Sequence, residues 1–142
     1  MSASKNRIYY LLQRAAHCLK TEADAVLTQA GGLTTAQAAV MLIIAEDGPA
    51  TQRHVAETLS QRESAITAMA TRLLKAGYIT KRRSPKDARA WELEVTEKGR
   101  LAITKLRQPF EDINAKLDAQ IDGDEMRELA TALAKVIEVF DN

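Results

Sequence analysis

Apolar residues near the N-terminus recur at helical spacing. Between Ile8 and Leu27 they fall three or four positions apart, which places them on one face of a long helix. The set consists of Ile8, Leu11, Leu12, Ala15, Ala16, Leu19, Ala23, Val26 and Leu27. Gly31 and Gly32 follow and predict a helix end and a turn, because glycine readily adopts the left-handed conformation that ends many helices.

A second, mostly buried helix is predicted after this turn. Thr34 or Thr35 has the side chain expected of its N-cap residue. The sequence is then almost continuously apolar through Ala45, which predicts contact with a core on most sides of the helix. The Asp-Gly-Pro segment at residues 47–49 ends it.

The stretch from Thr51 to Gly77 has the pattern of two helices separated by a short turn. Thr51 is the predicted N-cap of the first helix, whose apolar face consists of Val55, Ala56 and Leu59. Ser60 and Glu63 have the spacing of a capping box at the start of the second helix, and a cap one or two residues later is the alternative. This second helix is predicted to run to about residue 76 and to stop at Gly77.

The second helix of this pair has two different faces. The inward face carries Ile66, Met69, Ala70 and Leu73, and the opposite face carries Ser64, Ala65, Thr67, Ala68, Thr71 and Arg72. Small residues and hydroxyls let a helix backbone approach base edges, and a helix-turn-helix presents its second helix to the DNA major groove. An ordinary solvated face has the same composition, so this helix alone does not decide between the two interpretations.

Two strands and a charged tip follow. Residues 78–83 form the first predicted strand, and residues 91–95 alternate apolar with charged side chains, as a half-buried strand does. Five cations lie on this hairpin, namely Lys81, Arg82, Arg83, Lys86 and Arg89. Tyr78 and Trp91 are expected to pack inward. A basic hairpin beside a helix-turn-helix can reach phosphates or the minor groove.

The C-terminal third predicts two more amphipathic helices. Thr96 caps the first, which Pro109 is expected to bend and whose apolar side carries Leu101, Leu106, Phe110, Ile113 and Leu117. The segment 122–124 separates it from the last helix, lined by Met126, Leu129, Leu133, Val136 or Ile137, and Phe140. These helices and the N-terminal one have apolar stripes without an obvious core of their own. We therefore expect them to interlock with a second copy of the chain.

Composition and charge distribution narrow the class of protein. The 142 residues include only 6 Gly and 3 Pro, which favours long helices and a mainly α fold. The net charge is +1, but residues 62–107 contain 12 Lys and Arg against 5 Asp and Glu. This basic segment predicts a polyanionic partner. The single cysteine and the lack of a secretory signal pattern lead us to expect a cytoplasmic location.

The order of these elements resembles the MarR family of bacterial transcription regulators. The motifs that carry the resemblance are Leu33-Thr34-x-x-Gln37, Ser64-x-Ile66-Thr67, Arg72-Leu73-x-x-x-Gly77-Tyr78-Ile79, Asp87-Ala88-Arg89 and Val95-Thr96-Glu97-Lys98-Gly99. The resemblance covers nearly the whole chain. It implies one winged helix-turn-helix domain over residues 1–142, with the DNA-binding part at 33–99 and dimerisation helices at 1–32 and 100–142.

The resemblance also implies a function. It predicts a homodimer that binds a pseudo-palindromic operator in double-stranded DNA, usually as a repressor, and that a small, often aromatic, ligand releases. The family's wing usually reads Asp-Arg-Arg, in which the Asp pairs with an Arg that enters the minor groove. Asp87 and Arg89 match this pattern, whereas Ala88 replaces the middle Arg. One groove or phosphate contact is therefore expected to be weaker here.

The roles expected in DNA binding follow from these assignments. Ser64, Ala65, Thr67, Ala68, Thr71 and Arg72 face the major groove, with Arg72 as a guanine or phosphate contact. Arg89 enters the minor groove, and Asp87 orients it through a charge-assisted hydrogen bond. The phosphate candidates are Thr51, Gln52, Arg53, Arg62, Arg82, Arg83 and Lys86. Binding is then expected to weaken steeply with salt.

The sequence indicates the ligand and redox sites less specifically than the DNA contacts. A pocket between the dimerisation helices and the winged part would be lined by Tyr10, Arg14, His17, Met41 and Phe110, each of which core packing or surface exposure also explains. Cys18 is a redox candidate, in the manner of the family's hydroperoxide-sensing branch. It lies well inside its helix, however, too far from the helix end for the dipole to lower a thiol pKa, and a small buried hydrophobe explains it equally.

Other function classes find less support in the sequence. No phosphate-loop, dinucleotide-binding or nucleophile-elbow motif occurs, so catalysis and a cofactor are not expected. His17, His54 and Cys18 lack metal-ligand spacing, and no metal is expected. A helical protein-interaction domain without specific DNA binding remains an alternative, which the cations of the hairpin disfavour. An RNA-binding winged helix would need exposed aromatic side chains for base stacking, and few are expected.

Overall fold

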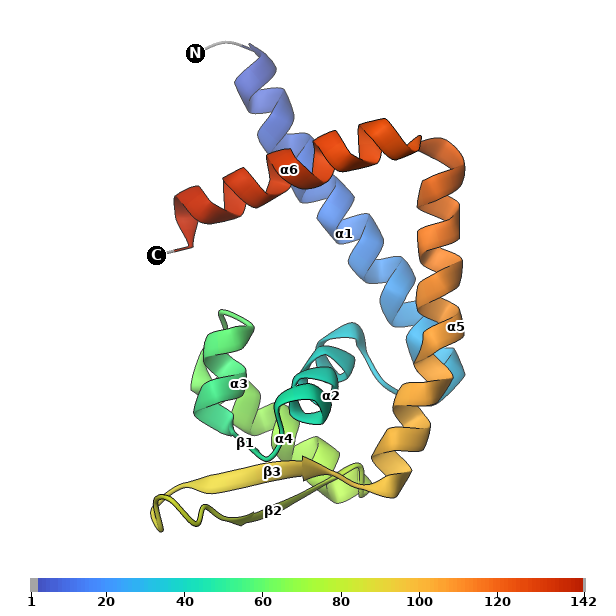
Figure 1. Ribbon diagram of the computed structural model, residues 1–142. Helices are drawn as coiled ribbons and strands as arrows, with labels where there is room; N and C mark the ends of the chain where they lie inside the picture. The colour runs from blue at the N-terminus through green and yellow to red at the C-terminus, as the bar shows by residue number, and fades with distance from the viewer. Residues whose placement is uncertain (1–2, 142) are drawn as a thin grey trace. The chain divides into compact units, whose positions relative to one another are not determined.

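The computed structural model describes residues 3–141 and is mainly helical, as predicted (Figure 1). In chain order, the elements are α1 (Ala3–Gly31), α2 (Thr35–Asp47), β1 (Ala50–Thr51), α3 (Gln52–Thr58), α4 (Glu63–Ala76), β2 (Ile79–Arg83), β3 (Trp91–Val95), α5 (Glu97–Gln120) and α6 (Gly123–Phe140). The chain divides into two compact units, one reaching Pro109 and the other beginning at Phe110. Helix α5 therefore contributes to both.

Helix α2 supplies the centre of the first unit's core. It begins with the capping box that its sequence suggests. The Thr34 hydroxyl accepts the Gln37 N–H at 3.2 Å, and the Gln37 side-chain oxygen accepts the Thr34 N–H at 3.0 Å. Its buried residues are Ala38, Val40, Met41 and Ile44. Around them pack buried apolar side chains from α1, α3, α4, both long strands and the first half of α5, including Leu27, Val55, Leu73, Leu93 and Leu106.

The sheet has three strands in the order β1-β3-β2, all antiparallel. In the hairpin, Arg83 lies opposite Trp91 and Ile79 lies opposite Val95. The sequence predicted this two-stranded hairpin but missed β1, in which Ala50 pairs with Leu93. A strand of two residues has no alternation to detect, and only its pairing with a distant segment defines it.

The end of α4 is tied to the start of α5. Gly77 has a φ of 79°, the left-handed conformation that ends α4 as predicted. The Thr96 hydroxyl donates to the Gly77 carbonyl at 2.6 Å and accepts the Gly99 N–H at 3.0 Å, so Thr96 caps α5 as expected. Lys98 Nζ donates to the Ala76 carbonyl at 2.7 Å. These bonds anchor both ends of the hairpin's sequence to the helical core.

The second unit contains the last part of α5 and helix α6. Asp122 is the N-cap of α6 and accepts the Glu125 N–H at 2.9 Å, and this hydrogen bond lowers the pKa of the Asp122 carboxyl. No residue of α6 is buried within the described chain, although the helix is strongly amphipathic. Across the described residues, no single helix is long and apolar enough to cross a membrane, and only the bent pair 7–31 and 35–47 passes by length and composition.

Candidate nucleic-acid interface

The turn between α3 and α4 is built differently from the prediction. Ser60 has a φ of 52° and ends α3, because the Ser60 N–H donates to the Glu57 carbonyl at 3.2 Å and the Gln61 N–H to the Ala56 carbonyl at 2.9 Å. The Ser60–Glu63 capping box therefore does not form, since Ser60 already ends the preceding helix, and the cap lies two residues later, as the alternative had it. Helix α4 instead begins after Arg62, an N-cap residue without a side-chain hydrogen bond.

Helix α4 separates a buried from an exposed face, as a recognition helix must. Ile66, Ala70 and Leu73 are buried and hold the helix against the core. Five of the six predicted groove-facing residues are exposed, namely Ser64, Thr67, Ala68, Thr71 and Arg72. Ala65 and the predicted inward residue Met69 are both half-buried at the boundary between the faces. These five residues are small or carry hydroxyls, apart from Arg72, which lies near the C-terminal end of the helix together with exposed Lys75.

Two threonine hydroxyls on this face donate hydrogen bonds to acceptors within the protein. Thr67 Oγ1 lies 2.7 Å from Gln52 Oε1 and 2.9 Å from the Glu63 carbonyl oxygen, and Thr71 Oγ1 donates to the Thr67 carbonyl at 2.9 Å. A hydroxyl has a single proton, so each threonine offers its lone pairs and its methyl group outward. Such groups suit base-edge donors and the thymine methyl. The contact between Gln52 and Thr67, which the sequence did not suggest, links the start of α3 to the recognition helix.

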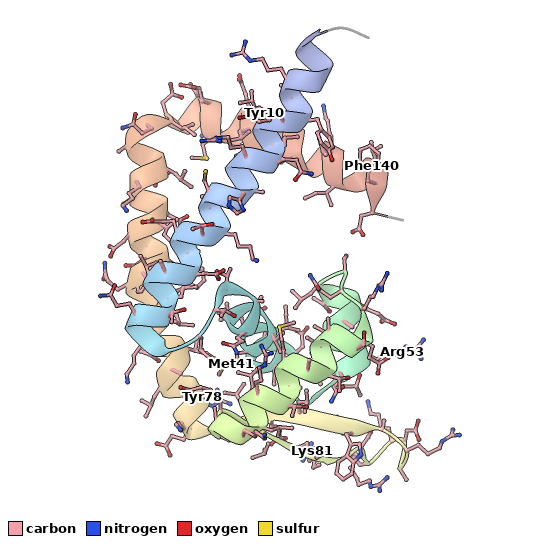
Figure 2. All side chains as sticks on the ribbon, turned by 180° about the vertical axis from the view of Figure 1, so that it is seen from behind. Tyr10, Met41, Arg53, Tyr78, Lys81 and Phe140 are labelled. Carbon is pink, nitrogen blue, oxygen red and sulfur yellow. The ribbon has the colours of Figure 1, made fainter. Side chains whose placement is uncertain are left out.

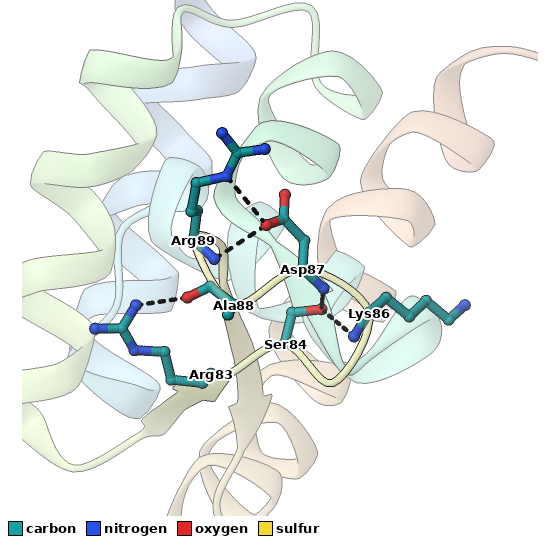
Figure 3. Close-up of polar contacts among 6 residues, drawn as sticks. All are labelled: Arg83, Ser84, Lys86, Asp87, Ala88 and Arg89. Carbon is teal, nitrogen blue, oxygen red and sulfur yellow. Dashed lines mark hydrogen bonds and ion pairs between the residues drawn. The ribbon is translucent and has the colours of Figure 1, made fainter.

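The wing tip between β2 and β3 is ordered by its own polar contacts (Figure 3). The Ser84 hydroxyl accepts the N–H groups of Lys86 and Asp87 at 3.2 and 3.3 Å. The Asp87 carboxylate accepts the Arg89 N–H at 3.0 Å and lies 3.5 Å from Arg89 Nε. The predicted Asp87–Arg89 pair therefore forms. The Arg89 side chain is 94% exposed, free to enter a groove.

The cations of the hairpin have different surroundings. Arg82 pairs with Glu94 at 3.4 Å, on one face of the hairpin. Lys81 and Arg83 lie over the Trp91 ring on the other face, 4.9 and 4.6 Å from its centroid. Trp91 is 39% exposed, so the expectation that it packs inward is wrong. It shares a face with buried Leu93, but the tip of the hairpin extends beyond the helices that cover Leu93 (Figure 1). Tyr78 is half-buried, beneath Lys98.

The other phosphate candidates lie at the starts of α3 and α4. Thr51 is the N-cap of α3 and accepts the His54 N–H at 3.1 Å, as its sequence predicts. Arg53 projects from the same turn (Figure 2) and pairs with Glu57 at 3.2 Å, with both side chains largely exposed. A pair so exposed is weak and is readily exchanged for a phosphate. Arg62 and Lys86 are exposed at the start of α4 and at the wing tip.

The predicted ligand residues differ in burial and are divided between the two units. Tyr10, Arg14 and His17 are exposed on α1, and Phe110 is half-buried in the second unit. Met41 is fully buried and points into the core of the first unit (Figure 2). A cleft of about 190 Å³ in this unit is lined by Ile44, Ala45, Gly48, Pro49, Glu94, Val95 and Arg100, and none of the five predicted residues is among them.

The structure also shows the surroundings of the residues considered for redox sensing and metal binding. Cys18 is exposed in the middle of α1, so the alternative of a buried small hydrophobe does not hold within this chain. His54 Nε2 lies 2.8 Å from Asp47 Oδ2, joining α3 to the end of α2. The residues described contain no group of three or more His, Cys, Asp or Glu side chains arranged to hold a metal ion.

These features define a class of protein. A helix-turn-helix followed by an antiparallel hairpin, with an exposed polar helix face beside a cationic tip, is a winged helix-turn-helix. The family model described as the MarR family matches residues 31–90. An HTH-type transcriptional regulator of Bacillus cereus is 31% identical over 105 residues, covering 73% of this chain and 69% of the relative.

Two further relatives agree with this match. HTH-type transcriptional repressor MdtR of Bacillus subtilis is 27% identical over 110 residues, covering 78% of this chain and 71% of MdtR. The solved structure of the transcriptional repressor CouR bound to a 23-mer DNA duplex has a TM-score of 0.80 at 27% identity and covers 89% of both chains. The chain belongs to the MarR family of winged helix-turn-helix transcriptional regulators, and it is not an enzyme.

Proposed function

We propose that this regulator is a repressor that binds a pseudo-palindromic operator in double-stranded DNA as a homodimer. The observation that carries the proposal is the pairing of an exposed recognition-helix face with a wing tip that holds Arg89 exposed beside Asp87. The names of the relatives MdtR and CouR, both repressors, support it, as does the duplex bound to CouR. The bacterial cytoplasm, where the DNA is, is the inferred site of action.

The interface divides into two kinds of contact. Ser64, Ala65, Thr67, Ala68, Thr71 and Arg72 face the major groove, and Arg89 enters the minor groove. In this proposal the phosphate contacts come from Thr51, Gln52, Arg53, Arg62, Arg82 and Lys86, which fix the register of the protein on the duplex without reading its sequence. Base contacts supply the specificity.

A second copy of the chain completes the molecule. Exposed apolar side chains on α1 include Ile8, Tyr9, Tyr10 and Leu11, and those on α6 include Leu129, Leu133, Ile137 and Phe140. Helices in proteins take most of their stability from packing an amphipathic face, and no residue of α6 is buried within the described chain. A partner that covers α1 and α6 would also set two recognition helices about one helical turn of DNA apart, about 34 Å. The same proposal includes release of the regulator from DNA by a small ligand. The candidate residues for its binding pocket are Tyr10, Arg14, His17 and Phe110.

The test begins with genomic DNA captured by the purified protein, followed by a footprint on the best site at two salt concentrations. We expect a palindromic site whose half-sites lie about one helical turn apart, with affinity that falls steeply as salt rises. Only weak, sequence-blind binding would reject the repressor function and favour the protein-interaction alternative.

Arg89→Ala tests the wing at the same site. We expect operator affinity to fall about tenfold, with a smaller salt slope, because an exposed cation leaves the groove. Lys135→Ala removes a cation from α6 and serves as the matched control. Unchanged affinity of Arg89→Ala at physiological salt would exclude the groove role of Arg89 and leave operator binding itself intact.

A further inference from the structure

Trp91 occupies an unusual position on the wing. It is the only tryptophan in the chain. As the first residue of β3, it lies on the same face as Leu93 and Val95, because side chains alternate along a strand. Leu93 is fully buried, whereas Trp91 is 39% exposed. The cations Lys81 and Arg83 cover its ring, with Lys81 Nζ 4.9 Å and Arg83 Cζ 4.6 Å from the ring centroid. In a core residue, by contrast, apolar side chains of other elements cover the ring.

Arg83 makes a second contact that connects this ring to the wing tip. Its Nη1 donates to the Ala88 carbonyl at 2.6 Å (Figure 3). Ala88 lies between Asp87 and Arg89, the pair in which Asp87 is to orient Arg89 for the minor groove. The contacts therefore run from the Trp91 ring through the Arg83 guanidinium to the backbone at Ala88. The planar guanidinium can stack on a ring and donate in its own plane at the same time.

We propose that Trp91 and Arg83 form a brace that positions the wing tip for DNA. The Trp91 ring holds the Arg83 guanidinium, which fixes the Ala88 carbonyl and thereby presents Arg89. Arg83 is then a positioning residue, in contrast to the phosphate contact that its charge alone suggests. A tip of seven residues ordered before binding loses less conformational freedom on contact with DNA. This inference rests on the proposed DNA-binding function and assigns a role within it.

The brace contacts the backbone of residue 88, where alanine stands in place of the family's middle arginine. The carbonyl that Arg83 holds belongs to Ala88, whose side chain makes no polar contact of its own. The neighbouring cation Arg82 provides a matched control for Arg83, because the two side chains lie on different faces of the hairpin. It points to the opposite face of the hairpin and pairs with Glu94, so its removal changes the charge equally but leaves the Trp91 ring untouched.

The first experiment measures the fluorescence of Trp91 in the protein without DNA. For Arg83→Gln we expect a shifted emission maximum and faster quenching by acrylamide, a neutral quencher that does not respond to the loss of charge, since the guanidinium no longer covers the ring. For Arg82→Gln we expect the emission of the wild-type protein. Emission of Arg83→Gln identical to that of the wild type would overturn the brace, whatever the protein does with DNA.

The second experiment measures the affinity of labelled operator DNA across a range of salt concentrations. If Arg83 acts as a brace, the Arg83→Gln variant is expected to bind operator DNA about three- to tenfold more weakly, with an unchanged salt slope. A salt slope reduced by about one would show that Arg83 binds a phosphate directly, and would overturn the proposal whatever the emission shows. A wild-type protein without salt-sensitive operator binding would instead reject the proposed function.

Conservative replacement completes the design. Trp91→Phe keeps a ring with a weaker cation–π interaction and is expected to lose less affinity than Trp91→Ala. Circular dichroism checks that both variants remain folded. Wild-type affinity in the Trp91→Ala variant would overturn the proposal.

Discussion

Gly99 shows how tightly a single residue can be constrained. It is buried in the first turn of α5, where a β-carbon would collide with the Tyr78 carbonyl and lie 2.7 Å from Val95 Cγ1. Backbone atoms cannot move aside as the end of a flexible side chain can. Gly99→Ala is therefore expected to lower the free energy of unfolding by about 2 kcal/mol or more, measured by urea denaturation.

Gly123 provides the control for that substitution. It is the first residue of α6, and a β-carbon there would meet open space. Gly123→Ala is expected to stabilise the protein by about 0.4–1 kcal/mol, because alanine restricts the unfolded chain. A loss below about 0.5 kcal/mol in Gly99→Ala would show that β2 and α5 can separate at this point without cost.

At the scale of an element, the start of the recognition helix shows a conflict between helix stability and DNA binding. Its N-cap residue, Arg62, has extended backbone angles but makes no capping hydrogen bond. Arg62→Ser is expected to raise the free energy of unfolding by about 1 kcal/mol, because serine can accept an N–H of the first turn. The same change is expected to weaken operator binding and reduce the salt slope by about one, because a phosphate contact is lost.

Thr34→Ala separates the two effects of that change. It removes the capping box of α2 and is expected to cost about 1 kcal/mol in stability while leaving operator affinity unchanged. Thermal unfolding and labelled-DNA anisotropy measure the two quantities. An Arg62→Ser protein that keeps wild-type affinity would remove Arg62 from the DNA interface.

Most element boundaries were predictable, and the failures share a physical cause. Thr34, Thr51 and Gly77 end or begin helices through contacts with residues at most five positions away, so the local sequence indicates them. Ser60 misled the prediction because its capping spacing is also local. Which of two adjacent helices Ser60 serves depends on how α3 and α4 pack together. Strand β1 pairs with a segment about forty residues further on, which no local pattern reports.

At the scale of the whole molecule, the exposed apolar face of α6 leads to a prediction about assembly. The wild-type protein is expected to elute with the mass of two chains in light-scattering chromatography, and its melting temperature is expected to rise with protein concentration. Leu133→Glu is expected to yield single chains or to unfold the protein, since a charge enters the exposed apolar face that the proposed second copy would cover.

Thr131→Glu introduces the same charge on the opposite face of α6 and should leave the dimer intact, because residues 131 and 133 are about 160° apart around a helix. A wild-type protein that remains a single chain at tens of micromolar, with a melting temperature independent of concentration, would contradict the dimer. It would also leave the spacing of two operator half-sites without a structural basis.

The candidate site divides into what the sequence indicates and what packing decides. The exposed face of α4 follows from helical periodicity, and the Asp87–Arg89 pair joins neighbours on one turn, so both were predicted. The contact of Gln52 with Thr67 and the stacking of Arg83 on Trp91 were not. Each joins residues from different elements, and their geometry exists only once those elements have packed.

The sequence by itself determined the helices, most of their caps, the hairpin and the family, because hydrophobic periodicity and capping act over a few residues. Only the tertiary structure decided that Ala50 joins the sheet, that Met41 is buried in the core, and that Trp91 lies exposed under two cations. The reason is that burial and pairing depend on which distant segment lies opposite a residue. From sequence alone, the same side chain can therefore be read as a core residue, a ligand contact or a brace, and its neighbours in the folded protein decide which role it has.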